Sequence, residues 1–238
     1  MRLKRFMNAL DDKAERRYCR WLCFFDNQAK LQLYTPDFAS RLQGVDSYAF
    51  IEEWYAKAKA DAFLDRTLYV DVHTYLPDDL MVKVDIATMA HALEARSPFL
   101  DHRIMEFAAS LPHQLKLHGW QTKYFLKKAF QGLLPREILG RPKMGFGVPL
   151  DNWFRKELRE MAYDILLSRR AIERGYFRPE TIRHLLDTHC HRKADHSYRI
   201  WALLILEMWH LEFMDRGRDK VRSGLRHRET NHESCQYI

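Results

Sequence analysis

The sequence predicts a mostly α-helical fold, and two observations support this prediction. Apolar residues recur three and four positions apart along most of the 238 residues, which is the spacing of one helix face. No alternating run of β-branched residues of useful length is present, so the pattern does not require a sheet. We therefore expect one helical domain over roughly 1–215, followed by a basic, disordered segment over 216–238.

The predicted helices of the first half are each marked by an apolar face and a start or stop signal. The first covers Asp11–Phe25, and the second follows a predicted N-cap at Asp46. A third has apolar residues on one face from Leu64 to Leu76 and is expected to stop at Pro77. Asp101 is expected to cap the next helix, because its carboxylate can accept from the first free backbone amides.

Further helices are predicted in the second half from proline and acidic start signals. Pro135 is expected to open a short helical turn, since the first turn of a helix tolerates proline. Asp151 precedes "NWFRKELREMAYDILLS", which we expect to form one long helix. Pro179 is expected to open another helix, which ends near Thr188.

The last predicted helix begins with Ser197 as its cap and runs to about Met214. Its apolar residues lie nearly all round the helix, which predicts a central, buried position. The same stretch is the most apolar of the chain, but charged residues such as Arg199 and Glu207 interrupt it. We therefore expect no membrane span.

Composition favours a soluble globular protein, because 47% of the residues are hydrophobic and 30% are charged. The net charge of +7 would allow a polyanionic partner, but many of the cations crowd the last segment without stacking aromatic residues between them. We expect a solvated tail there and no nucleic-acid partner. The basic residues of that segment are Arg216, Arg218, Lys220, Arg222, Arg226 and Arg228.

The cysteines and histidines do not form a pattern with a clear function. Four cysteines in a chain of this length, without an apolar leader after Met1, predict a reducing cytoplasm and no disulfide framework. One cluster invites a metal interpretation, but its spacings match no zinc pattern, so we expect a polar helix end and no metal site. Its members are His184, His189, Cys190, His191 and His196.

Charged residues interrupt the apolar pattern in the segment 74–103. A carboxylate placed among apolar residues must be exposed, hydrogen-bonded or paired, because burying it alone is costly. For Asp78 and Asp101 we expect helix caps or structural ion pairs. For Glu94 and Arg96, which flank one alanine just before a proline, a structural pair and a substrate contact both remain open. Lys83 and Asp85 lie in the same segment.

The second unusual segment is "GRPKMGFGVPL", residues 140–150, which we call the lysine loop. The ammonium group of Lys143 is a compact charge suited to phosphate oxygens. Gly145 and Gly147 would let backbone approach a ligand or take a positive φ. The order is not that of a Walker loop, so by itself the segment favours a turn between two helices with an exposed lysine.

Together, these segments resemble the synthetase domain of glutamine-dependent asparagine synthetases. The resemblance rests on "YLPDDLMVKVD", "EARSPFLDHR", "RPKMGFGVPL" and "HSYRIWALLILEMW" in this order, and it covers about residues 60–214 and, more loosely, the start. It implies the helical C-terminal portion of a synthetase domain of the ATP pyrophosphatase type, also called adenine-nucleotide α-hydrolase-like.

The resemblance also implies a reaction and a set of site residues. In that family, ATP adenylates the side-chain carboxylate of aspartate, pyrophosphate leaves, and ammonia derived from glutamine attacks the acyl-adenylate. The lysine that matches Lys143 approaches the phosphates, beside Gly145 and Gly147, and would stabilise charge on the departing pyrophosphate. Four further residues match the segment near the substrate end of the site: Lys83, Asp85, Glu94 and Arg96.

Departures from the family pattern limit the activity expected of this chain. The signatures S-G-G-x-D-S and S-G-E-G-S-D-E, which serve ATP and Mg²⁺ in the family, do not occur here, and Arg2 follows Met1 where the family's glutaminase exposes a cysteine. We therefore expect a partial synthetase domain that is inactive alone and is completed by a chain carrying the missing core. Relatives of that family amidate or cyclise other carboxylates, so a ligase for another acceptor is an alternative, and so is a non-catalytic helical module. Ile86 stands where the family often has arginine, so the charge pair of that arginine is not expected here.

Overall fold

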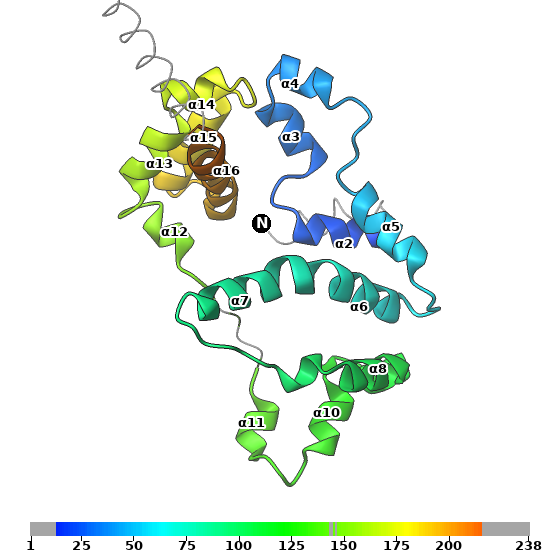
Figure 1. Ribbon diagram of the computed structural model, residues 1–238. Coiled ribbons are helices and arrows are strands. Elements are labelled where there is room, and N and C mark those ends of the chain that lie inside the picture. The colour runs from blue at the N-terminus through cyan, green and yellow to red at the C-terminus, as the bar shows by residue number, and fades with distance from the viewer. Residues whose placement is uncertain (1–12, 143–144, 146, 216–238) are drawn as a thin grey trace, which may run out of the picture. The chain divides into compact units, whose positions relative to one another are not determined.

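The structure is a computed structural model that describes residues 13–142, 145 and 147–215 (Figure 1). The chain divides into two compact units, which we describe one at a time. The first unit consists of Met1–Cys19 and Asp46–Phe146, and the second unit of Arg20–Val45 and Gly147–Ile238. Helices dominate both units, which confirms the predicted fold class. The boundary expected near residue 215 stays a prediction, because 216–238 lie outside the described residues.

The α-helices of the first unit are between 4 and 11 residues long. Helix α2 (Ala14–Leu22) runs from this unit into the second, and it ends three residues earlier than we expected. The other helices are α5 (Ala49–Lys57), α6 (Phe63–His73), α7 (Val82–Met89), α8 (His102–Ser110), α9 (His113–Lys116), α10 (Tyr124–Ala129) and α11 (Arg136–Gly140). A π-helical segment, η1 (Leu76–Met81), and a 3₁₀ turn, η2 (Pro98–Leu100), complete its helical elements.

A two-stranded antiparallel hairpin, β1 (Leu117–His118) and β2 (Gln121–Thr122), lies between α9 and α10. Its two-residue turn has Gly119 at a positive φ of 58°, a conformation that glycine adopts without steric cost. Two residues per strand are too few to produce an alternating pattern, so the sequence did not reveal this hairpin.

Pro77 does not stop the chain's helical path, and our expectation that it would was wrong. Helices α6 and α7 continue one another through η1, and Figure 1 shows them as one long run. The α-helical pattern breaks just before the proline, at Thr74, whose hydroxyl donates to the carbonyl of Val70 at 2.7 Å. Pro77 then occupies the first turn of η1, where its missing amide leaves no hydrogen bond unmade.

The two predicted aspartate caps have different outcomes. The carboxylate of Asp101 accepts from the amide of Arg103 at 2.9 Å, directly before α8, which confirms the predicted cap. Asp46 accepts from the amide of Tyr48 at 2.9 Å, but α5 begins only at Ala49. Asp46 therefore closes a turn ahead of the helix and is not its N-cap.

The core of the first unit is small and centres on α2, α5 and α6. Its buried side chains are Cys19, Tyr48, Tyr55, Val70 and Thr74. At its edge the Arg16 guanidinium donates to carboxylates from two parts of the chain, at 2.6 Å to Asp46 and 2.7 Å to Glu52. Tyr18 donates to the Asp71 carboxylate, which joins α2 to α6.

The second unit is built around one long helix, α16 (Ser197–Trp209), which continues into the π-helical segment η3 (His210–Asp215). Around it lie α3 (Asn27–Leu33), α4 (Pro36–Arg41), α12 (Leu150–Trp153), α13 (Arg159–Leu166), α14 (Arg169–Glu173) and α15 (Pro179–Cys190). Pro179 opens α15 as predicted. The single helix predicted after Asp151 is instead two helices, α12 and α13, separated by a turn that includes the buried Phe154.

One face of α16 forms the centre of the core in the second unit. Ile200, Leu203 and Leu204 are buried there against side chains of α12, α13 and α15. The opposite face stays open, because Trp201, Ile205 and Trp209 are between 38% and 46% exposed. The prediction of a helix buried all round was therefore wrong. In the part of the chain that the structure describes, no helix has the length and apolar character needed to cross a membrane.

Asp195, and not the predicted Ser197, accepts the hydrogen bonds at the start of α16. The Asp195 carboxylate accepts from the amide of Ser197 at 3.0 Å and from its hydroxyl at 2.7 Å. Ser197 is thus the donor and lies within the first turn of α16, and the predicted serine cap was wrong.

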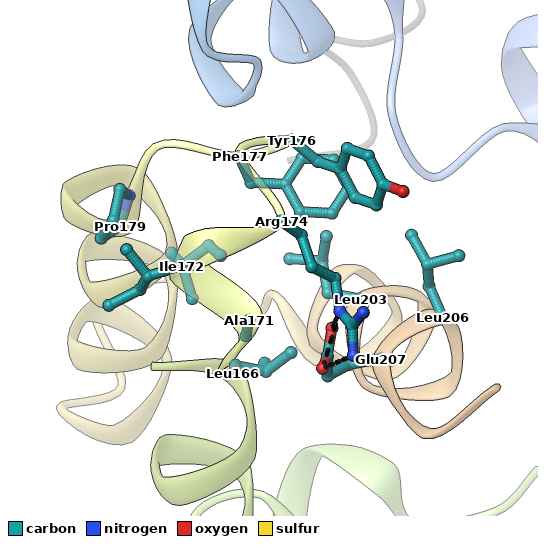
Figure 2. Close-up of a pocket in the computed structure, with 11 residues that line it drawn as sticks. Leu166, Ala171, Ile172, Arg174, Tyr176, Phe177, Pro179, Leu203, Leu206 and Glu207 are labelled. Carbon is teal, nitrogen blue, oxygen red and sulfur yellow. Dashed lines mark hydrogen bonds and ion pairs between the residues drawn. The ribbon is translucent and has the colours of Figure 1, made fainter. Parts of the chain in front are cut away.

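A buried ion network closes the second unit (Figure 2). The Arg174 guanidinium, which follows α14, donates to both oxygens of Glu207 at 2.8–3.0 Å. It also donates to the Asp215 carboxylate at 2.5 Å. The three side chains are only 8–11% exposed. Because these groups are taken out of water together, removing the Arg174 guanidinium leaves Glu207 buried without its cation and Asp215 with the longer contact to Arg170, at 3.5 Å.

We predict that Arg174→Ala lowers the free energy of unfolding by about 3–5 kcal/mol, the usual cost of breaking a buried ion pair by removing one partner. Equilibrium urea unfolding followed by circular dichroism measures this loss. Arg169→Ala is the matched control, because Arg169 pairs with Glu173 on the surface of the preceding helix and is 91% exposed. Equal destabilisation by both substitutions would contradict the importance of the buried network.

Candidate functional site

The first pair of predicted site residues lies on α7. Lys83 and Asp85 are both exposed, and two positions along a helix they point to different sides. The same helix exposes three apolar side chains, Val82, Ile86 and Met89, at helical spacing. Helix α7 therefore presents charged and apolar residues together, which is unusual for a face that only meets water.

Glu94 and Arg96 lie in the segment between α7 and η2. Helix α7 ends at Met89 and is followed by a turn, in which Ala92 takes a left-handed conformation with φ 52° and the amide of Leu93 donates to the carbonyl of Thr88 at 3.1 Å. The chain is then irregular, and the Arg96 Nε donates to the Glu94 carboxylate at 2.7 Å. The side chains are 86% and 69% exposed, respectively. The ion pair, one of the two alternatives left open above, is present, and a substrate contact stays a prediction.

Two other acidic residues of the segment 74–103, Asp101 and Asp78, were expected to cap helices or form ion pairs. Asp101 caps α8 and also pairs with Arg103 at 2.8 Å, so both structural roles considered for it are confirmed. The Arg103 side chain and backbone amide hold the pKa of Asp101 below its ordinary value. Asp78 lies exposed in the first turn of η1, and the cap or ion pair expected of it stays a prediction.

The lysine loop links α11 to α12, and the structure describes it only in part. Lys143 lies outside the described residues, so its predicted contact with phosphate stays a prediction. Gly145 and Gly147 are described and exposed, neither has a positive φ, and no atom lies within 4 Å of where a Cβ would be. A positive φ is therefore not the reason for glycine at either position, and close approach to a ligand stays a prediction.

The C-terminal end of the lysine loop is fixed in the core of the second unit. Leu150 and Phe154 are buried among residues of α13, α15 and α16. The Nε2 of His189 lies 3.0 Å from the carbonyl of Asp151, and the Arg155 guanidinium donates to the Asp151 carboxylate at 2.9 Å. Sequence reasoning placed His189 only in a polar helix end and missed this contact. Its spacing after Ile182, Leu185 and Leu186 on the buried face of α15 was the available signal.

The predicted site residues do not converge into one complete site. Within 13–142, 145 and 147–215, the Glu94–Arg96 pair is the one hydrogen bond or ion pair that joins two of them. No group of three or more His, Cys, Asp or Glu side chains in these ranges could hold a metal ion. The described carboxylates thus do not fit Mg²⁺, and we derive no step through that ion.

A cavity in the second unit does not provide a substrate site either. Figure 2 shows its apolar walls, including Leu166, Phe177 and Leu203, beside Arg174 and Glu207. Its volume of about 20 Å³ holds one water molecule and not a nucleotide. Arg174 already donates to two carboxylates, so it has little capacity left for an anionic ligand.

Comparisons with known proteins identify relatives of the chain. Glutamine-hydrolysing asparagine synthetase 1 of Bacillus subtilis is 33% identical over 189 residues, which is 78% of this chain and 28% of that relative. The asparagine synthetase of Gallus gallus is 38% identical over 108 residues, 42% of this chain and 19% of the relative. That of Homo sapiens is 28% identical over 169 residues, 65% of this chain and 29% of the relative. The chain thus spans less than a third of each of these relatives' length.

No solved structure matches the chain significantly. The sequence model of the asparagine synthase family matches residues 1–211, which is most of the chain and includes α7, the Glu94–Arg96 pair and the whole lysine loop. The match covers both units and confirms the family resemblance of the segments described above. The chain therefore belongs to the asparagine synthase family.

Proposed function

We propose that the chain supplies the helical part of an ATP-dependent ligase that converts aspartate to asparagine. In this reaction ATP adenylates the side-chain carboxylate, pyrophosphate leaves, and ammonia released from glutamine attacks the acyl-adenylate. The observation that supports the proposal most directly is the family match across the whole lysine loop. The buried anchor of this loop at Leu150 is the feature expected of a loop that must hold a cation in place.

Lys143 is the residue to which we assign a catalytic role. When the bond between the α- and β-phosphates breaks, negative charge increases on the departing pyrophosphate. An ammonium group held next to those oxygens stabilises that charge more in the transition state than in bound ATP. Gly145 and Gly147 follow the lysine in the sequence, and no atom lies within 4 Å of where their Cβ would be, so the backbone at these two positions could approach the phosphates.

Glu94 and Arg96 are assigned to the acceptor end of the site, together with Lys83 and Asp85. Their side chains are exposed, so a bound amino acid could reach them without rearrangement of a core. Aspartate has an ammonium group and two carboxylates. An adjacent acid and base such as Glu94 and Arg96 could pair with opposite charges of this substrate.

We further propose that other residues must complete the site. The 238 residues contain neither of the two glycine- and acid-rich signatures that serve ATP and Mg²⁺ in the family. The exposed apolar residues of α7, Val82, Ile86 and Met89, supply a surface against which such residues could pack. The intact ligase would take small-molecule substrates and act in the cytoplasm.

A second candidate keeps the chemistry and changes the carboxylate acceptor. Ile86 stands in α7 where the family often has arginine, and its side chain is 64% exposed. Replacing a cation by an apolar group removes a carboxylate partner and favours a less polar substrate. An acceptor screen in the complete enzyme would separate the two candidates, since a preference for another carboxylate over aspartate would support the second.

We predict that the chain alone, mixed with ATP, Mg²⁺, aspartate and ammonia, releases no pyrophosphate, because half a site cannot position both reactants. A coupled pyrophosphate assay measures this. Addition of a polypeptide that carries the two missing signatures is expected to start release. Steady release by the chain alone would contradict the need for completion, and no release with any such polypeptide would favour a non-catalytic helical module.

In the completed enzyme, Lys143→Ala is expected to lower kcat for pyrophosphate release at least about a hundredfold, the usual cost of removing one preorganised charge-stabilising group. Lys156→Ala is the matched control, because Lys156 is an exposed lysine of the following segment and has no assigned role. Comparable losses from both substitutions would show that Lys143 does not act on the phosphates.

Arg96→Ala and Glu94→Ala are expected to leave the urea unfolding midpoint unchanged, because the pair is exposed and solvent screens it. Both substitutions should raise KM for the acceptor in the completed enzyme. Arg16→Ala, which removes a half-buried cation from two carboxylates, is expected to lower the midpoint and serves as the structural comparison. Loss of stability in the Glu94 or Arg96 variants would favour a purely structural pair.

A further inference from the structure

We propose that His189 is a positioning residue that fixes the C-terminal end of the lysine loop, and that its protonation loosens this end. The proposal rests on the proposed function only where it concerns catalysis by the lysine loop, because the contacts of His189 lie within the second unit. His189 belongs to α15, far from the lysine loop in the sequence, and it has 0% exposed surface.

His189 connects three elements through backbone groups. Its Nε2 bonds the carbonyl of Asp151 in α12 at 3.0 Å. Its Nδ1 lies 3.2 Å from the amide of His196, directly before α16. Its own carbonyl accepts from the Arg155 Nε at 3.2 Å, and Arg155 in turn bonds the Asp151 carboxylate. The first turn after the lysine loop is thus tied to α15 and to the start of α16 by the imidazole and the guanidinium.

These two partners require one protonation state of the imidazole. A carbonyl oxygen can only accept, so the Nε2 of His189 must carry the hydrogen. The amide of His196 can only donate, so the Nδ1 must have a free lone pair. The neutral Nε2–H tautomer satisfies both groups. A proton added at Nδ1 would face the His196 N–H and break that bond.

The surroundings of His189 largely oppose its protonation. Burial lowers its pKa below the ordinary value of 6.5, and the nearby Arg155 cation acts in the same direction. Asp195, 3.7 Å from the Nδ1, and Asp151 oppose this shift. His196 is the remaining titratable neighbour, and burial lowers its pKa as well.

The sign of the pH effect follows from this lowered pKa. Above pH 6.5 the imidazole is neutral in both the anchored and the released state, so the anchor keeps its full stability. As the pH falls below 6.5, the released state gains a proton that the anchored state resists, and release becomes more favourable. Acidification should therefore loosen the turn that holds Leu150 before it affects the core helices.

Hydrogen exchange with mass spectrometry tests this directly on the full chain. The reporters are the amides of Asn152, Trp153 and Phe154, which donate to Pro149 and Leu150 carbonyls at 3.0–3.1 Å. The reference amides are those of α13 and α16. We expect His189→Ala to lower the protection of the reporter amides about tenfold or more, as for the loss of a buried hydrogen bond, with little change in the reference helices.

The pH profile separates positioning from general stabilisation. Between pH 7.5 and 5.5, with rates corrected for intrinsic exchange, reporter protection should fall in the native chain relative to the reference helices. His189→Gln keeps a donor for the Asp151 carbonyl without a titratable group, so it should retain protection and lose the pH dependence. His184→Gln, an exposed histidine of the same helix, should behave as the native chain.

Two outcomes would overturn the proposal. In the first, the reporter and reference amides of His189→Ala lose protection in parallel, which would mean that His189 stabilises the whole core and not the loop end in particular. In the second, the pH dependence persists in His189→Gln, which would assign it to another group such as His196. Neither readout needs activity. If Lys143→Ala left kcat unchanged, that result would overturn only the proposed function, and the test of His189 would stand.

Discussion

The packing of α12, α13 and α15 against one face of α16 is the constraint on which the second unit depends. It buries Leu150, the last residue of the lysine loop, and Phe154 in the turn that follows α12, and so gives one end of that loop a fixed place. Arg174 closes the same unit by joining α14 to Glu207 and Asp215 near the end of the long helix. The apolar face supplies most of the free energy of burial, and the buried ion network makes the loss of Arg174 costly.

The first unit has a different character. Its core consists of a few side chains around Tyr55 and Val70, whereas α7 and the segment after it expose apolar and charged residues together. Residues predicted to contact the acceptor, such as Glu94 and Arg96, lie on this exposed part. This arrangement agrees with a chain that spans less than a third of the length of relatives such as that of Bacillus subtilis. Under the proposed function, this exposed face is one that other residues would cover.

The histidine-rich end of α15 shows how a side-chain pattern can be misjudged. Five potential metal ligands occur close together in the sequence, but backbone groups determine what they do. His189 is buried between two backbone partners, while His191 is exposed and bonds the carbonyl of Asp187 at 2.7 Å. Burial and hydrogen bonding separate these neighbours because successive positions on a helix face different environments.

The sequence by itself determined the helical class, the family and the position of the lysine loop, because these depend on local periodicity and on the order of residues along the chain. It also predicted the Asp101 cap, which involves only neighbouring residues. Only the tertiary structure decided that Pro77 continues a helix, that α16 is buried on one face, and that His189 meets Asp151. Each of these depends on which distant segments pack together, and local propensity contains no record of such contacts.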